Sequence, residues 1–180
     1  MKKLFKSLEK LICRFYPIFQ LYHNLYKDVV KKEVELAGIT KDDVVLNVGC
    51  GAIPFTALHV VEMTGAKVIA LDKDRKAVKM ARKYLKKYKL DRNIEIKLGD
   101  GTSEKLPPFT VAIIALHIKD KDKMLESLKA FGNSRGRIIF RQPVDEHKEE
   151  YGYLTDKYQP DEKSFQKMKT FKESCLFLIP

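Results

Sequence analysis

The chain has 180 residues with 44% hydrophobic and 33% charged side chains, and its formal net charge is +11 at pH 7. This length accommodates one domain with its own core, and the composition excludes a disordered or collagen-like chain. The positive charge favours an anionic partner such as RNA or a phospholipid surface, and a lysine-rich solvated surface is the competing interpretation.

The chain begins with two predicted helices. Apolar residues recur at helical spacing over residues 2–15, which indicates an amphipathic helix that either contacts an anionic membrane or RNA surface or packs on the domain. A second helix is predicted over residues 18–37, ending at Gly38. On this helix, Tyr22 and Tyr26 either contact a bound cofactor or pack against neighbouring elements.

From residue 43 onward, short apolar runs alternate with helical patterns. The predicted strands are residues 43–48, 67–72, 94–98, 110–116, 136–141 and 174–179. The predicted helices are residues 54–64, 74–88, 121–131 and 161–170. Because continuously apolar strands need cover on both faces, this alternation predicts a doubly wound, mostly parallel α/β sheet. The polar stretch 143–163 is interpreted as a loop on the substrate side, with a short strand near 151–155.

We therefore predict a single domain over residues 1–180, with a helical cap at 1–40 and an α/β core at 41–180. The three cysteines are widely spaced and form no CxxC pair, so the sequence predicts neither a disulfide framework nor a metal site. Their pattern favours a reducing, cytoplasmic location. The longest apolar run, 111–116, is too short to cross a bilayer, and charged residues interrupt any signal-peptide core near the N-terminus.

Glycine or aspartate lies at or just after the end of each of the first three predicted strands of the core. The turn 49–51 reads Gly-Cys-Gly, which lets the backbone bend sharply and leaves no side chain between the main chain and a ligand. Asp72 ends the next strand, where a carboxylate can accept hydrogen bonds from both ribose hydroxyls. Asp100 follows the third strand, where it can bind the adenine edge. Carboxyl ends of neighbouring parallel strands meet at one edge, so these positions predict a site for a nucleoside-bearing cofactor.

A dinucleotide fits this turn less well. A GxGxxG fingerprint beginning at Gly49 needs a third glycine at position 54, where the sequence has Pro54. Proline starts a helix well but cannot donate the amide hydrogen bond that a pyrophosphate needs. The sequence therefore favours a cofactor without phosphates.

At these positions the chain resembles the class I S-adenosylmethionine-dependent methyltransferases. Residues 45–51 resemble the family's glycine motif, Asp72 its ribose-binding acidic residue, and 99–101 its adenine-side motif. The resemblance implies a Rossmann-like sheet of seven strands with the last one antiparallel, and S-adenosylmethionine as the cofactor. The cofactor contacts that it implies are Asn47, Gly49, Cys50, Gly51, Asp72, Lys73, Asp100, Gly101 and Leu116.

The chain also departs from that family. Asn47 stands where an acidic residue is usual, and no Asn-Pro-Pro-Tyr signature follows the fourth strand. Residues 49–56 additionally resemble the glycine-x-glycine-x-x-proline-x-threonine loop of nicotianamine synthases. Those enzymes share the fold and the cofactor but transfer its aminocarboxypropyl group instead of its methyl group.

Three functions remain open at this point. The first is methyl transfer to an unknown acceptor, either a small molecule or RNA; the second is aminocarboxypropyl transfer; the third is a binding module that senses the cofactor. His117, at the end of the fourth strand, is the candidate general base, with a plain surface histidine as the alternative. Arg141 and Gln142, after the fifth strand, either orient an acceptor or have a structural role.

Overall fold

The computed structural model describes residues 16–102, 106–132 and 135–180, and side chains from residue 23 onward. The predicted helix over residues 2–15 lies outside the described residues. The second predicted helix is present as α2 (Tyr16–Ala37), which begins two residues earlier than expected. No helix in the described part of the chain is both long and apolar enough to span a membrane.

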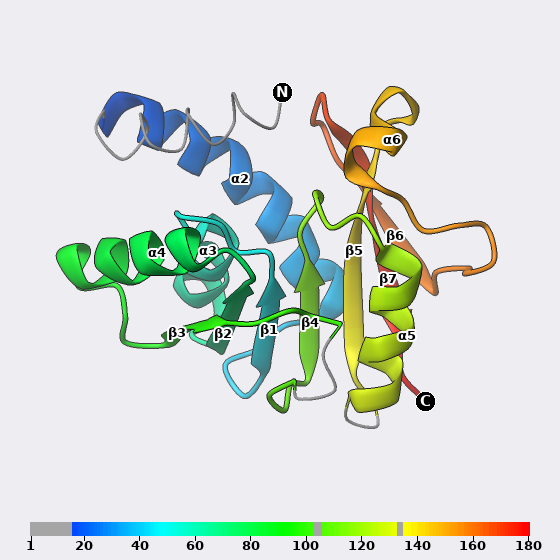
Figure 1. Cartoon of the computed structure of the whole chain (residues 1–180), viewed down its shortest axis with the longest axis horizontal. Coiled ribbons are helices and arrows are strands. Elements are labelled where there is room, and N and C mark those ends of the chain that lie inside the picture. The colour runs from blue at the N-terminus through cyan, green and yellow to red at the C-terminus, as the bar shows by residue number, and fades with distance from the viewer. Residues whose placement is uncertain (1–15, 103–105, 133–134) are drawn as a thin grey trace.

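A sheet with the strand order β3-β2-β1-β4-β5-β7-β6 forms the centre of the molecule (Figure 1). Its strands are β1 (Val44–Val48), β2 (Lys67–Asp72), β3 (Ile94–Leu98), β4 (Val111–Ile114), β5 (Arg137–Pro143), β6 (Glu162–Phe165) and β7 (Phe171–Leu178). The strands β1 to β5 pair in parallel, and β7 runs antiparallel to both β5 and β6. The prediction of a seven-stranded, mostly parallel sheet with the last strand antiparallel is confirmed.

Helices cover both faces of the sheet, which explains why its central strands are apolar throughout. The helices α2, α3 (Phe55–Thr64) and α4 (Arg75–Tyr88) pack on one face, and α5 (Lys121–Phe131) packs on the other. In α4, the residues Val78, Ala81 and Leu85 face the sheet, while lysines and arginines occupy the solvent side. Its first residues are capped by Asp74, whose side chain accepts a hydrogen bond from the Lys76 amide at 2.8 Å.

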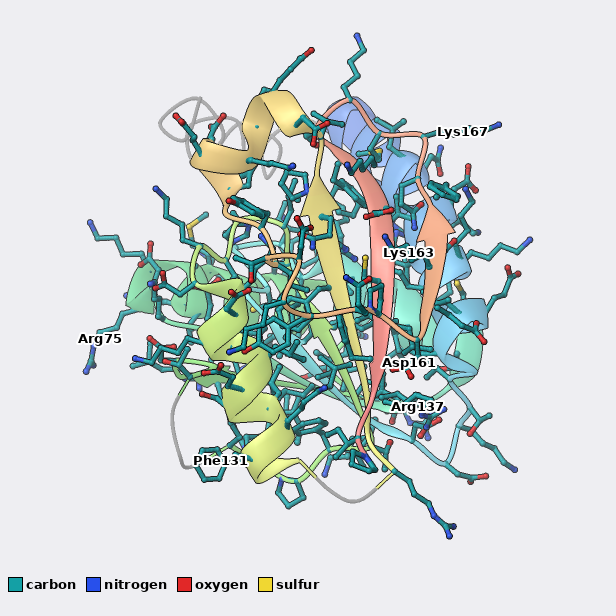
Figure 2. All side chains as sticks on the ribbon, turned by 90° about the vertical axis from the view of Figure 1, so that its right-hand side faces the viewer. Arg75, Phe131, Arg137, Asp161, Lys163 and Lys167 are labelled. Atoms are coloured by element: carbon teal, nitrogen blue, oxygen red, sulfur yellow. The ribbon has the colours of Figure 1, made fainter. Side chains whose placement is uncertain are left out.

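Two predicted elements were wrong. Residues 161–170 are not a helix, because 162–165 form the edge strand β6, which pairs with β7 (Figure 2). Residues 151–155 are not a strand. A 3-10 turn (Asp145–His147) leads into the short helix α6 (Lys148–Tyr151), and the chain then turns at Gly152. Gly152 has φ +71°, and a Cβ there would lie 2.1 Å from the Lys119 carbonyl oxygen, so only glycine fits.

A buried ion pair connects α2 to β5. Arg141 donates from Nε to Glu33 Oε1 at 2.8 Å and from Nη2 to Glu33 Oε2 at 2.7 Å. Only 3% of the Arg141 side chain and none of the Glu33 side chain is exposed. Arg141 also donates to the Thr56 hydroxyl at 3.0 Å, and the Ser174 hydroxyl donates to Glu33 at 2.8 Å. One polar network therefore joins α2, α3, β5 and β7.

Candidate functional site

The carboxyl ends of β1 to β4 meet at one edge of the sheet (Figure 1). The turn after β1 contains Gly49 with φ +80° and Gly51 with φ +70°, a region that favours glycine. The amides of Gly49 and Cys50 both donate to the Leu71 carbonyl, at 2.8 Å and 3.0 Å. The turn is therefore fixed to the end of β2.

Gly49 also permits a close approach of the turn that follows β4. A Cβ at this position would lie 3.1 Å from Ala115 Cβ, 3.2 Å from Ile118 Cδ1 and 3.4 Å from His117 Nε2. A side chain at residue 49 would push these two turns apart. The structure thus brings His117 beside the glycine turn.

Asp72 holds the ends of β1 and β2 together. Its Oδ2 accepts a hydrogen bond from the Gly51 amide at 2.8 Å, and its Oδ1 accepts one from the Asp74 amide at 2.9 Å. The side chain remains partly exposed. Each carboxylate oxygen has a second lone pair, so the oriented group can still accept from a ligand's hydroxyls.

Asp100 lies two residues after β3, whose last residue, Leu98, pairs with Asp72. Its Oδ1 accepts hydrogen bonds from the Thr102 amide at 3.0 Å and the Thr102 hydroxyl at 2.9 Å. The Thr102 amide contributes most to lowering the pKa of Asp100, and the Lys73 and Lys123 ammonium groups lower it further. The exposed carboxylate is therefore ionised and has Lys73 in its electrostatic range.

Gly101 allows the loop after β3 to pack closely against the sheet. A Cβ there would lie 2.6 Å from Val48 Cγ1 and 2.8 Å from Met124 Sδ, so no side chain fits between β1 and α5. Cys50 is buried, with its Sγ 3.6 Å from the Gly51 carbonyl oxygen. Both residues therefore shape the edge through backbone and packing.

Asn47 lies apart from the open edge. It is buried within the sheet, where its Nδ2 donates to the Ile113 carbonyl at 3.3 Å. Its Oδ1 is buried and has no hydrogen-bond partner among the described residues. Asn47 therefore lies beneath the glycine turn, and a direct cofactor contact by this side chain stays a prediction.

Sequence reasoning missed Lys121, which supports the turn after β4. Its buried Nζ lies within hydrogen-bond distance of four carbonyl oxygens: those of Leu116 at 2.7 Å, Ile118 at 2.9 Å, Tyr151 at 2.9 Å and Gly152 at 2.8 Å. An ammonium has three N–H donors, so two of these carbonyls share one donor. One ammonium thus ties the turn that carries Leu116 and His117 to the end of α6. A lysine at the start of a helix gives no sequence signal of this role.

Because Lys121 is buried, we expect the free energy of unfolding to depend on pH. Burial lowers the pKa of its ammonium to about 7, against 10.5 when unperturbed. At pH values between these two pKa values, Lys121 is protonated in a larger fraction of unfolded chains than of folded chains. The free energy of unfolding therefore rises with pH, by at most about 1.4 kcal/mol per pH unit from this group. We expect urea unfolding at pH 7, 8 and 9 to show the wild type gaining stability relative to Lys121→Met. Parallel pH profiles would contradict this assignment.

Arg141 and Gln142 both have protein partners. Arg141 is part of the buried network, and Gln142 Oε1 accepts a hydrogen bond from the Leu154 amide at 3.1 Å. Gln142 also lines a hollow of about 250 Å³ beside β5 and β7. None of the residues predicted to contact the cofactor lines this hollow. Both side chains thus have structural partners in the described part of the chain.

The start of α3 offers few donors to a phosphate. Pro54, the residue that caps the helix, has no amide hydrogen, and the Phe55 amide donates to the Ile53 carbonyl at 2.9 Å. Neither position can donate to an anion at the helix N-terminus. This geometry agrees with the prediction of a cofactor without phosphates.

Comparisons with known proteins agree with this geometry. A family model described as "Methyltransferase domain" matches residues 39–177. An L-histidine 2-aminobutanoyltransferase from Yersinia pestis is 29% identical over 122 residues, which are 67% of this chain and 45% of that protein. A ribosomal RNA small subunit methyltransferase A from Thermotoga petrophila is 27% identical over 134 residues, which are 71% of this chain and 50% of that protein. The chain thus spans about half the length of these curated relatives.

Solved structures share the fold. A mutant of MtNAS in complex with S-adenosylmethionine superposes with a TM-score of 0.75 at 18% identity, covering 87% of this chain and 63% of that chain. An RNA methyltransferase from Salinibacter ruber in complex with S-adenosyl-L-homocysteine superposes with a TM-score of 0.68 at 19% identity, covering 85% of this chain and 91% of that chain.

Proposed function

Because the chain belongs to the methyltransferase domain family, we propose that it binds S-adenosylmethionine at the carboxyl ends of β1 to β3 and transfers the methyl group to an acceptor. The observation that carries this proposal is the Asp72 carboxylate, which is bonded to Gly51 across two strand ends at 2.8 Å. It has the orientation and the free lone pairs needed to accept from ribose hydroxyls. Asp100 and Gly101 then lie where the adenine would be bound.

The bound cofactor supplies an activated methyl carbon on sulfonium, so the protein mainly has to orient the acceptor and exclude water. In this proposal, the glycine turn and Asp72 hold the nucleoside, and Lys73 and Leu116 flank it. His117, exposed in the turn beside Gly49, takes a proton from the acceptor. The chain acts as one domain, with α2 as part of its cap, and the widely spaced cysteines support a cytoplasmic location.

An anionic acceptor such as RNA is supported by the surface of α4. This helix contains no acidic residue, and its exposed side chains are basic except for Tyr88. The exposed cations are Arg75, Lys76, Lys79, Arg82, Lys83, Lys86 and Lys87. Such a surface attracts phosphates in a salt-dependent way, and the Thermotoga relative is a ribosomal RNA methyltransferase.

Aminocarboxypropyl transfer is the second candidate. The loop from Gly49 to Thr56 has the nicotianamine synthase spacing, and Thr56 is bound to Arg141 at 3.0 Å instead of facing solvent. The Yersinia relative is a 2-aminobutanoyltransferase, and the likeness to MtNAS extends over most of the chain. These observations support S-adenosylmethionine as the cofactor, but with the bond from sulfur to the aminocarboxypropyl group broken instead of the bond to the methyl group.

Product analysis separates the candidates. We expect calorimetry to detect binding of S-adenosylmethionine; turnover is then measured with acceptor pools of small amines, L-histidine and ribosomal RNA fragments. S-adenosylhomocysteine as the product identifies methyl transfer, and methylthioadenosine identifies aminocarboxypropyl transfer. Binding without turnover on any pool would favour a sensing module, and a lack of binding would contradict all three functions.

A further inference from the structure

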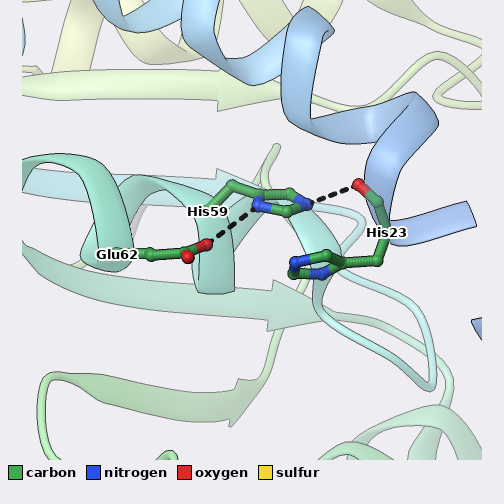
Figure 3. Close-up of side chains that lie close together, drawn as sticks. All are labelled: His23, His59 and Glu62. Atoms are coloured by element: carbon green, nitrogen blue, oxygen red, sulfur yellow. Dashed lines mark hydrogen bonds and ion pairs between the residues drawn. The ribbon is translucent and has the colours of Figure 1, made fainter. Parts of the chain in front are cut away.

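Two histidines and a glutamate meet between α2 and α3. His23 lies on α2, and His59 and Glu62 lie one turn apart on α3 (Figure 3). One potential ligand atom from each residue lies within 4.8 Å of the other two. The His59 side chain is fully buried, whereas 52% of the Glu62 side chain is exposed. The cluster is therefore anchored inside and open to solvent on one side.

The hydrogen bonds of His59 determine which nitrogen faces the cluster. Its Nε2 lies 3.0 Å from the backbone carbonyl oxygen of His23, which can only accept, so Nε2 carries the proton. In the neutral ring, the Nδ1 lone pair then faces Glu62 Oε2 at 3.4 Å. Two acceptor atoms thus point at each other in the neutral ring, which is unfavourable unless a proton or a metal cation lies between them.

This arrangement has the features of a metal site. A histidine that binds a metal through one nitrogen usually donates the other N–H to a carbonyl or carboxylate, as His59 does. The His23 ring packs against His59 with a centroid separation of 4.2 Å, so its edge approaches the same point (Figure 3). Two imidazoles and a carboxylate suit Zn²⁺ among common divalent ions, with water as a fourth ligand.

We propose that His23, His59 and Glu62 bind a divalent transition metal, with Zn²⁺ as the best match to the donor set, and that the metal fastens α2 to α3. Ligand atoms around a tetrahedral zinc lie about 3.3 Å apart, so the side chains have to close in slightly. The exposed Glu62 can rotate to do so.

A metal bound by this cluster would affect how α2 packs on the start of α3. Tyr26, one turn after His23 on α2, stacks on Phe55 with a centroid separation of 5.9 Å. Phe55 is the first residue of α3, directly after the turn that contains Gly49 and Gly51. A metal at His23 and His59 therefore stabilises the contact between α2 and the start of α3, whatever reaction the chain performs.

The test uses the full chain, stripped of metal with a chelator and titrated with Zn²⁺ in competition with a chromophoric chelator. We expect one Zn²⁺ per chain and an increase in Tm on binding. Glu62→Gln, at an exposed position, and His23→Gln should each weaken zinc binding by at least about tenfold. Co²⁺ in place of Zn²⁺ should give the visible absorption of a four-coordinate site in the wild type only.

The chain offers a matched control. His147 and Glu150 repeat the same spacing, with Nδ1 and Oε2 3.7 Å apart, and no second histidine joins them in the described part of the chain. His147→Gln should leave zinc affinity unchanged. The proposal is overturned if the wild type binds no zinc, or if Glu62→Gln and His23→Gln bind it as tightly as the wild type does.

Discussion

Replacing Arg141 with methionine is expected to lower the free energy of unfolding by about 3–5 kcal/mol. Glu33, which is fully buried, would lose both of its hydrogen bonds from the guanidinium and be left as an unpaired carboxyl group in the interior. Burial disfavours the charged form of Arg141, but the ion pair with Glu33 outweighs this and raises the pKa of the guanidinium. The ion pair therefore offsets the cost of burying the two charges only when both partners are present. Urea unfolding at constant pH measures the loss.

Two further variants distinguish an unpaired charge from lost packing. Adding Glu33→Leu to Arg141→Met removes the unpaired carboxylate, so the double variant should be more stable than the single one. Lys31→Met breaks the exposed pair with Glu35, whose atoms are 4.0 Å apart, and should cost less than about 1 kcal/mol. If Arg141→Met costs as little as Lys31→Met, the ion pair does not hold α2 in place.

Replacing Asp72 with asparagine is expected to weaken S-adenosylmethionine binding by about 10- to 100-fold, since a hydrogen bond to a charged group contributes about 1.5–3 kcal/mol. Asparagine has the same size but only one acceptor oxygen, so it cannot accept from both the Gly51 and Asp74 amides. The site then loses both charge and orientation. Calorimetry with S-adenosylmethionine measures the affinity, and unfolding without ligand measures any change in fold stability.

The neighbouring carboxylate gives a control for this measurement. Asp74 accepts from the Lys76 amide as the cap of α4, and asparagine caps a helix equally well. Asp74→Asn should therefore bind the cofactor with unchanged affinity. An Asp72→Asn variant that binds as tightly as Asp74→Asn would show that Asp72 does not hold the cofactor.

The strands β1 to β5 could be predicted from sequence because each is a short apolar run, and burial on both faces requires that pattern. The edge strand β6 could not be predicted. Its residues 162–165 are mostly polar, and Phe165 remains 72% exposed. Such a strand exists because β7 offers backbone partners, and this pairing depends on residues that are distant in the sequence.

In the candidate site, too, some residues could be predicted from the sequence and others could not. Glycines and aspartates at strand ends could be found from sequence, since parallel strands bring their carboxyl ends together. The supporting side chains could not be found. Arg141 meets Glu33 across 108 positions, and Lys121 meets the Gly152 carbonyl across 31. Burial, which distinguishes these residues from ordinary surface cations, is a property of the folded chain.

The strand order also determines when the sheet can be completed during synthesis. β7 is the last strand in the chain but lies inside the sheet, between β5 and β6. As the chain emerges from its N-terminus, β1 to β5 can pair early, whereas β6 has no neighbour among the described strands until β7 arrives. Glu33 accepts a hydrogen bond from Ser174, 141 positions later in the sequence. Contacts this distant form slowly, so the polar network around Glu33 is completed only after β7 has been made.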